Sequence, residues 1–169
     1  MNEKTVDACD LTTVPPAPAG SEAIPGSVDA RPEVAGETAS RLAFTPAALE
    51  LIERLWAMHG PLMFHQSGGC CDGSSPMCYQ EGEFRTGGQD VLLGTLELPP
   101  LSAAAGDAAD AGDAETAGGP REIGFWMSRE QFGVWSHTHL TVDAVPGRGS
   151  GFSLEAPEGM RFLIRSRLL

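Results

Sequence analysis

The clearest alternation of apolar and polar positions lies between residues 45 and 61. Apolar side chains recur there at the spacing of one helix face, and they are Leu49, Ile52, Leu55 and Trp56. Charged residues take the opposite side, and they are Glu50, Glu53 and Arg54. Thr45 suits the N-cap, Pro46 suits the first helical position, and Gly60-Pro61 ends the pattern. The segment is therefore predicted to form a helix.

Shorter apolar or alternating segments follow, and they predict strands. They cover residues 62–66, 90–98, 122–127, 137–145, 152–155 and 160–167. A capping-box sequence that begins at Ser128 predicts a second, short helix that runs to Trp135. The order of these elements indicates a small α+β fold, in which a mixed β-sheet accompanies one long N-terminal helix and one short helix.

Two segments lack this periodicity, and they define the expected domain organisation. Residues 1–40 contain five prolines among alanines, glycines and acids, and residues 102–120 repeat Ala, Gly and Asp. Segments with so few large apolar side chains cannot offset the entropy lost on ordering. We therefore expect a disordered acidic tail over 1–40, one domain over 41–169, and a disordered insertion at 102–120.

The net charge of the chain indicates which classes of partner it is not expected to bind. The formal net charge is −12, and most of it falls in the two segments of low complexity. Because phosphate contacts dominate affinity for nucleic acids, an acidic chain without a basic run is not expected to bind them. No apolar run is long enough for a transmembrane helix, and no signal peptide is recognisable, so we expect no membrane association and a cytoplasmic location.

The residues with the strongest chemical character lie in one glycine-rich segment. His65 ends a predicted strand, Gly68 and Gly69 follow, and then come Cys70, Cys71 and, after a short gap, Cys78. Thiolates are the ligands that soft metals and iron–sulfur clusters require, and paired glycines let the backbone approach a bound group closely. The pattern predicts a metal or redox site with Cys70 and Cys71 as primary ligands, Gly68 and Gly69 beside the cofactor, and Cys78 as a further ligand.

Histidines supply further candidate ligands. His137 and His139 would share one face of the predicted strand 137–145, which suits two ligands to one metal, and His65 lies close in sequence to Cys70. Structural alternatives stay open at each position. The cysteines could be packed inside the fold, since buried free cysteine is common, and the two histidines could lie on a solvated strand face.

The chain resembles a bacterial domain-of-unknown-function family of small proteins. The matching stretches are MFHQSGGCCDGSSPMC at 63–78, DVLLG at 90–94, MSREQF at 127–132 and VPGRGSGFSLEAPEGMRFLIRS at 145–166. Members of that family are often encoded beside aldehyde or alcohol dehydrogenases. The resemblance therefore implies an aldehyde or alcohol dehydrogenase as a partner, but it implies no activity.

A more distant resemblance is to the HesB-like fold of the A-type iron–sulfur carriers. It rests on FTPAAL at 44–49, on Gly68-Gly69-Cys70, and on Gly149-Ser150-Gly151-Phe152. It implies a HesB-like fold and a metal or cluster held by Cys70. The carriers hold their cluster with two further cysteines in a C-terminal Cys-Gly-Cys, whereas this chain ends Arg165-Ser166-Arg167-Leu168-Leu169. Cys71, Cys78 and a histidine would have to replace those ligands.

Three hypotheses for function follow. The first is an accessory protein, not itself an enzyme, that binds iron, zinc, copper or an iron–sulfur cluster and assists a dehydrogenase. The second is a protein-interaction or regulatory module without metal, whose cysteines form a redox-sensitive pair. The third is an enzyme with Cys70 or Cys71 as nucleophile and His65 or His137 as base. A homodimer is the oligomer we consider for each of them.

Overall fold

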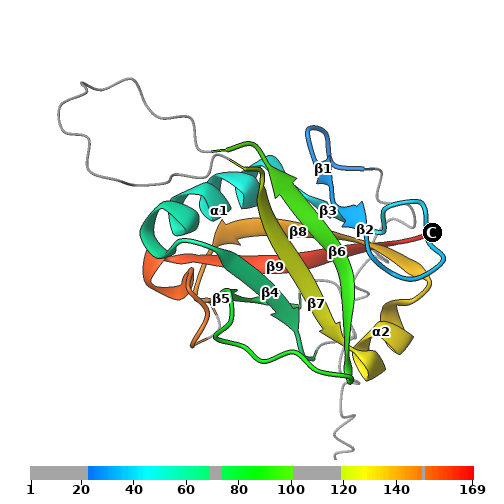
Figure 1. The fold of residues 1–169 in the computed structure, drawn as a ribbon. Helices are drawn as coiled ribbons and strands as arrows, with labels where there is room; N and C mark the ends of the chain where they lie inside the picture. The colour runs from blue at the N-terminus through cyan, green and yellow to red at the C-terminus, as the bar shows by residue number, and fades with distance from the viewer. Residues whose placement is uncertain (1–22, 69–73, 101–118, 150) are drawn as a thin grey trace, which may run out of the picture.

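The computed structural model describes residues 23–68, 74–100, 119–149 and 151–169 (Figure 1). Its strands form two mixed sheets. The four-stranded sheet has the order β1 (Val28–Asp29), β3 (Leu42–Phe44), β8 (Thr138–Pro146) and β9 (Met160–Leu168). The five-stranded sheet has the order β2 (Arg31–Pro32), β6 (Asp90–Leu98), β7 (Arg121–Ser128), β4 (Leu62–Gln66) and β5 (Met77–Gln80). The strands of the two sheets run in clearly different directions (Figure 1).

Each sheet contains one parallel pair. Strand β3 runs parallel to β8, and β4 runs parallel to β7. The other neighbouring strands are antiparallel. The pairing of β6 with β7 shifts register between Leu92 and Gly94, which is a β-bulge or a similar irregularity. The two parallel pairings join segments that are distant in sequence, as parallel strands require.

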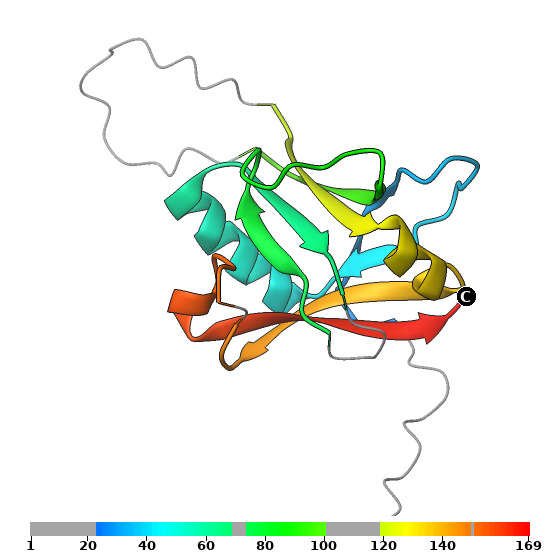
Figure 2. The same ribbon diagram turned by 90° about the horizontal axis from the view of Figure 1, so that it is seen from below.

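Two helices and a 3₁₀ turn complete the described part of the chain. Helix α1 spans Pro46–His59, helix α2 spans Arg129–Trp135, and the 3₁₀ turn η1 spans Ala156–Glu158. The Thr45 hydroxyl accepts a hydrogen bond from the Ala48 N–H, and Gly60 ends α1 with a positive φ of 79°. Helix α2 lies near the C-terminus in Figure 2. Both predicted helices are thus confirmed in position.

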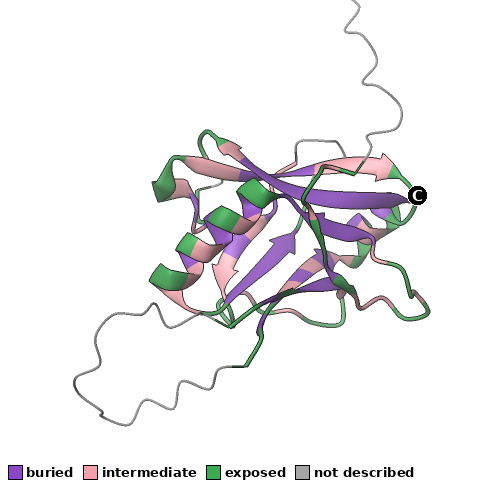
Figure 3. Cartoon of the chain, turned by 90° about the horizontal axis from the view of Figure 1, so that it is seen from above, coloured by how far each residue is buried: buried purple, intermediate pink, exposed green. Residues whose placement is uncertain are grey.

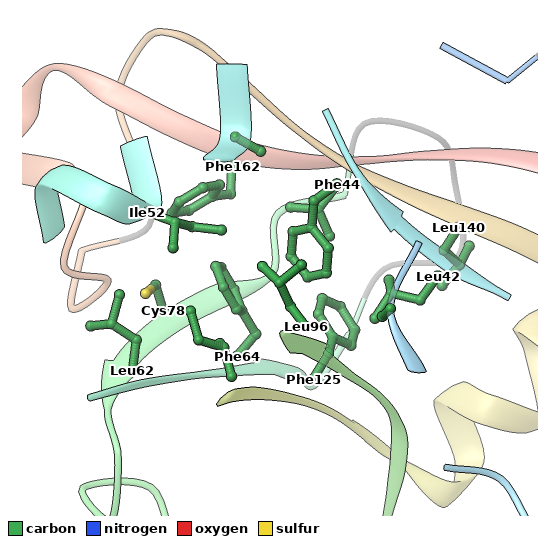
Figure 4. Packing of buried hydrophobic residues seen from close by; sticks show 14 of the residues in the cluster. Leu42, Phe44, Ile52, Leu62, Phe64, Cys78, Leu96, Phe125, Leu140 and Phe162 are labelled. Atoms are coloured by element: carbon green, nitrogen blue, oxygen red, sulfur yellow. The ribbon is translucent and has the colours of Figure 1, made fainter. Parts of the chain in front are cut away.

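The core lies between the two sheets and beneath helix α1. Strand β7 illustrates how the strands contribute to this core. Its residues alternate between buried and less buried positions, so that Ile123, Phe125 and Met127 point to the interior. Phe64 stands at the centre, with its ring centroid 5.9 Å from those of Phe44 and Phe125 and 4.9 Å from that of Phe162 (Figure 4). The inward side of α1 is buried, whereas its outer side is exposed (Figure 3).

The predicted fold class is wrong. Far more of the described residues lie in strands than in helices, the strands form two mixed sheets, and the helices are short, with 14 residues in α1 and 7 in α2. Helix α1 is not a long N-terminal helix, since three strands precede it. The HesB-like arrangement of one small sheet with a long helix therefore does not hold. The prediction failed because strands β1, β2, β3 and β5 are too short to show periodicity in the sequence.

One predicted strand is also missing. Residues 152–155 form turns rather than a strand, and Phe152 is 89% exposed. The backbone here is held by bonds outside any ladder, including the Leu154 N–H to the Cys78 carbonyl at 3.0 Å.

The described part of the predicted N-terminal tail contributes to both sheets. Val28–Asp29 pairs with β3, Arg31–Pro32 pairs with β6, and Ala30 between them is buried. Residues 1–22, and residues 102–118 of the predicted insertion, lie outside the described residues. No helix in the part of the chain that the structure describes is long and apolar enough to cross a membrane.

Candidate functional site

Cys78 is part of the hydrophobic core. Its side chain is fully buried beside Leu62 and Phe64 (Figure 4), since position 78 on β5 faces Phe64 on β4. Burial raises the pKa of the Cys78 thiol well above its usual range, and the nearby Glu155 carboxylate raises it further. A thiol held in its protonated form is a poor metal ligand, because metals bind the thiolate. The position of Cys78 fits the packing alternative.

His137 and His139 do not form a pair of ligands on one strand face. His137 is exposed in the turn before β8, which begins at Thr138, whereas His139 is buried in the four-stranded sheet. Burial lowers the pKa of His139, the positive charge of Arg167 lowers it further, and the Asp29 carboxylate opposes both effects. The lowered pKa disfavours the protonated form of His139 within the fold.

The predicted ligands are not brought together where the structure describes them. His65 belongs to the five-stranded sheet and His139 to the four-stranded sheet. Among the described residues, no group of three or more His, Cys, Asp or Glu side chains could hold a metal ion. Gly69, Cys70 and Cys71 lie outside the described residues, so a site made by the cysteine pair stays a prediction.

His65 has the most elaborate surroundings of the described candidate residues. Its Nε2 lies 2.8 Å from Oδ1 of Asp90, and its Nδ1 lies 2.7 Å from the Ser67 hydroxyl oxygen. The imidazole is almost fully buried, whereas Ser67 is exposed. The Phe84 ring covers the imidazole, with the ring centroids 4.1 Å apart. The arrangement is a hydrogen-bonded chain from a half-buried carboxylate through a buried imidazole to an accessible hydroxyl.

The state of Asp90 fixes the roles of the two ring nitrogens. The hydrogen bond from His65 lowers the pKa of Asp90, burial opposes this, and the bond from the Gly87 backbone N–H lowers it further. An ionised carboxylate only accepts hydrogen bonds, so in the neutral imidazole of His65 the hydrogen is on Nε2, and this N–H donates a hydrogen bond to Oδ1 of Asp90. Nδ1 is then the free acceptor, and the Ser67 hydroxyl donates to it.

Sequence reasoning missed both partners of His65. Asp90 is only the first residue of a predicted strand, and Ser67 is not among the predicted site residues. Strand β7 lies between β4 and β6 and places His65 near Asp90. Its residue Trp126 pairs with His65, and its residue Ser128 pairs with Asp90. The only signal in the sequence was the short spacing from His65 to Ser67, which puts both side chains on the same side of an extended chain.

Comparison with known proteins agrees with one of the two resemblances. A family model for a domain of unknown function matches residues 51–168, which is most of the chain and includes strands β4 to β9. No curated protein matches the chain. No solved structure matches it either. The chain therefore belongs to the family described as Domain of unknown function (DUF779).

Proposed function

We propose that the end of strand β4 is a nucleophilic site in which His65 acts as general base. The observation that carries the proposal is the chain of hydrogen bonds from Asp90 through His65 to Ser67, at 2.8 and 2.7 Å. A nucleophile, a base and a group that orients the base, each within hydrogen-bond reach of the next, are the arrangement that activates a hydroxyl or a thiol.

The reaction class that fits this arrangement is acyl transfer from a small ester or thioester. Nδ1 of His65 would take the proton of the nucleophile while its oxygen or sulfur attacks the acyl carbon, and the imidazolium would then protonate the leaving group. Asp90 would stabilise the imidazolium that forms. Ser67 is the nucleophile in contact with His65, and Cys70 and Cys71 follow it in sequence as alternative nucleophiles.

The experiment is acylation by p-nitrophenyl acetate, followed by mass spectrometry of the protein. We expect release of p-nitrophenol and the addition of one acetyl group to a peptide containing Ser67, Cys70 or Cys71. Ser67→Ala and a Cys70→Ser/Cys71→Ser double variant then distinguish the hydroxyl from the thiols. Removing the base in His65→Gln should slow acylation about 100-fold or more, and Asp90→Asn should slow it less.

His137→Gln is the matched control, because it removes an exposed imidazole outside the site. It should leave the rate of acylation unchanged. Equal rates for the wild type and the His65→Gln variant would contradict the proposal, as would acetylation confined to surface amines.

The second candidate function is the metal-binding accessory protein, and the same carboxylate–imidazole pair favours it. A histidine that binds a metal usually donates its other ring N–H to a carboxylate, as His65 does to Asp90. Cys70 and Cys71 would supply thiolates, and Nδ1 of His65 would exchange the Ser67 hydroxyl for the metal. The dehydrogenase partner implied by the family resemblance belongs to this proposal.

Elemental analysis of protein purified anaerobically without a metal-chelating tag tests this candidate. About one equivalent of iron, zinc or copper is expected in the wild type, and much less in the Cys70→Ser/Cys71→Ser and His65→Gln variants. His139→Gln should keep the metal, because His139 lies in the other sheet. Protein that stays free of metal after reconstitution would exclude the candidate.

A further inference from the structure

The outer face of the five-stranded sheet carries a cavity of about 350 Å³. Its floor is formed by residues of the three central strands on the face away from the core, namely Met63 on β4, Leu92 and Thr95 on β6, and Gly124 and Trp126 on β7. Residues of the segment 81–86 line one side of the cavity, and Phe84 is one of them. The Phe84 ring is held in place because it lies against both His65 and Tyr79, with centroids 4.1 and 5.2 Å away.

Gly124 keeps the cavity open. A Cβ atom at this position would lie 3.0 Å from Nε1 of Trp126 and 3.3 Å from Cδ1 of Leu92. The φ of Gly124 is not in the left-handed region, so the backbone itself does not require glycine there. The missing side chain therefore leaves room on the floor of the cavity beside Trp126 and Leu92.

The rim of the cavity is acidic. Glu81 and Glu122 line it, and none of the described lining residues is a lysine, an arginine or a histidine. Glu122 shares the guanidinium of Arg31 with two other carboxylates, those of Glu33 and Glu97. Three carboxylates around one guanidinium leave an excess of negative charge beside the opening.

We propose that this cavity binds a small organic cation, such as an arylalkylammonium ion or a quaternary ammonium compound. Among aromatic side chains, Trp attracts cations most effectively, through the face of its indole ring, and Trp126 lines the cavity. Met63 and Leu92 offer apolar surface to the uncharged part of the ligand, while Glu81 and Glu122 favour a positive head group. The inference concerns binding alone, and it holds whether or not His65 has the chemistry proposed above.

Isothermal titration calorimetry with three probes of similar size tests the charge preference. The probes are benzylamine, which is cationic at neutral pH, benzyl alcohol, which is neutral, and benzoate, which is anionic. We expect benzylamine to bind about tenfold more tightly than benzyl alcohol, and benzoate not to bind. Benzoate that binds as well as benzylamine, or no heat of binding with any of the probes, would overturn the proposal.

Two variants locate the binding. Gly124→Ala puts a methyl group on the floor and should weaken benzylamine binding at least about tenfold. Glu122→Gln removes one exposed carboxylate without filling the cavity, and it should weaken benzylamine binding more than benzyl alcohol binding. Gly133→Ala is the control, because a Cβ there meets no atom within 4 Å and the residue lies on α2. Unchanged affinity in both test variants would place the binding elsewhere and refute this site.

Discussion

At the scale of single residues, the least expected group is Glu155. Its side chain is fully buried, and burial raises the pKa of its carboxyl above the usual range, although a hydrogen bond from Ser153 opposes the shift. The Ser153 hydroxyl also accepts the Cys78 backbone N–H at 2.8 Å. Through these hydrogen bonds, Ser153 and Glu155 attach the segment after residue 151 to strand β5.

This environment predicts a loss of stability at high pH. A group whose pKa is raised in the folded state contributes its full stability below the unfolded-state pKa and loses it as the pH rises through the folded-state value. The side chain introduced by Glu155→Gln has no charge at any pH, so the free energy of unfolding of this variant should rise relative to the wild type as the pH increases above about 4, the unfolded-state pKa of a glutamate.

Urea denaturation at a series of pH values measures that difference. Glu158→Gln is the control, since Glu158 is an exposed residue of the neighbouring 3₁₀ turn. If the free energy of unfolding of the wild type and of Glu155→Gln changed in parallel across the pH range, ionisation of Glu155 would not destabilise the fold, and the prediction would be wrong.

At the scale of elements, one threonine joins helix α1 to strand β8. The Thr45 hydroxyl accepts the Ala48 N–H at 3.2 Å as the helix N-cap, and it donates to Oδ1 of Asp143 at 2.7 Å. Burial alone would raise the pKa of Asp143, but the hydrogen bonds from Thr45, Arg165 and the Ala144 N–H outweigh it and lower the pKa. Asp143 is therefore an ionised carboxylate that depends on its donors.

Thr45→Ala should cost about 2 to 3 kcal/mol of unfolding free energy at pH 7, because it removes a cap and leaves a buried carboxylate short of a donor. Ser128→Ala removes only the cap of α2 and should cost about 1 kcal/mol. The pKa of Asp143 is lowered in the folded state, so its contribution is present above the unfolded-state pKa and is lost as the pH falls through the folded-state value.

The cost of Thr45→Ala should therefore shrink in acid, whereas the cost of Ser128→Ala should not. Guanidinium denaturation near neutral pH and near pH 3 compares the two variants. Equal costs at both pH values would mean that Thr45 acts only as a cap.

At the scale of the whole molecule, the segment 28–32 connects the two sheets. Val28–Asp29 pairs with β3 in one sheet, Arg31–Pro32 pairs with β6 in the other, and Ala30 is buried where the chain crosses. Further along the same segment, Glu37 forms an ion pair with Arg41. These contacts attach residues 28–37 to the domain, although their composition is that of a tail.

Two truncations separate the parts of that tail. Deleting residues 2–40 should lower the unfolding free energy by about 2 kcal/mol or more, because it removes two strands and uncovers the edges of β3 and β6. Deleting residues 2–22 removes a segment poor in large apolar side chains and should change stability by less than about 0.5 kcal/mol. Thermal denaturation compares them, and equal melting temperatures for the two truncations would contradict the role given to residues 28–37.

The helices and strands that could be predicted from the amino-acid sequence are those whose signals lie within a few neighbouring residues. Thr45, Pro46 and Gly60 define the start and the end of α1, because a cap, an N1 proline and a positive-φ glycine act on the backbone within one turn. Ser128 predicted α2 for the same reason. Strands β4 and β6 were predicted with their observed bounds, and β7, β8 and β9 to within a residue at their ends, because short apolar or alternating segments between turn residues are typical of strands.

The pairing of the strands and the hydrogen-bond partners of the polar side chains could be seen only in the folded structure. The sequence analysis proposed His65, Cys78, His137 and His139 as candidate ligands in addition to Cys70 and Cys71. The fold buries Cys78 in the core and distributes the histidines over two sheets and a turn. It paired His65 instead with Asp90, through a strand that the sequence could not order between them. Periodicity reports which face of an element is apolar, whereas side-chain partners depend on strand order and register, which arise from contacts between residues far apart in the chain.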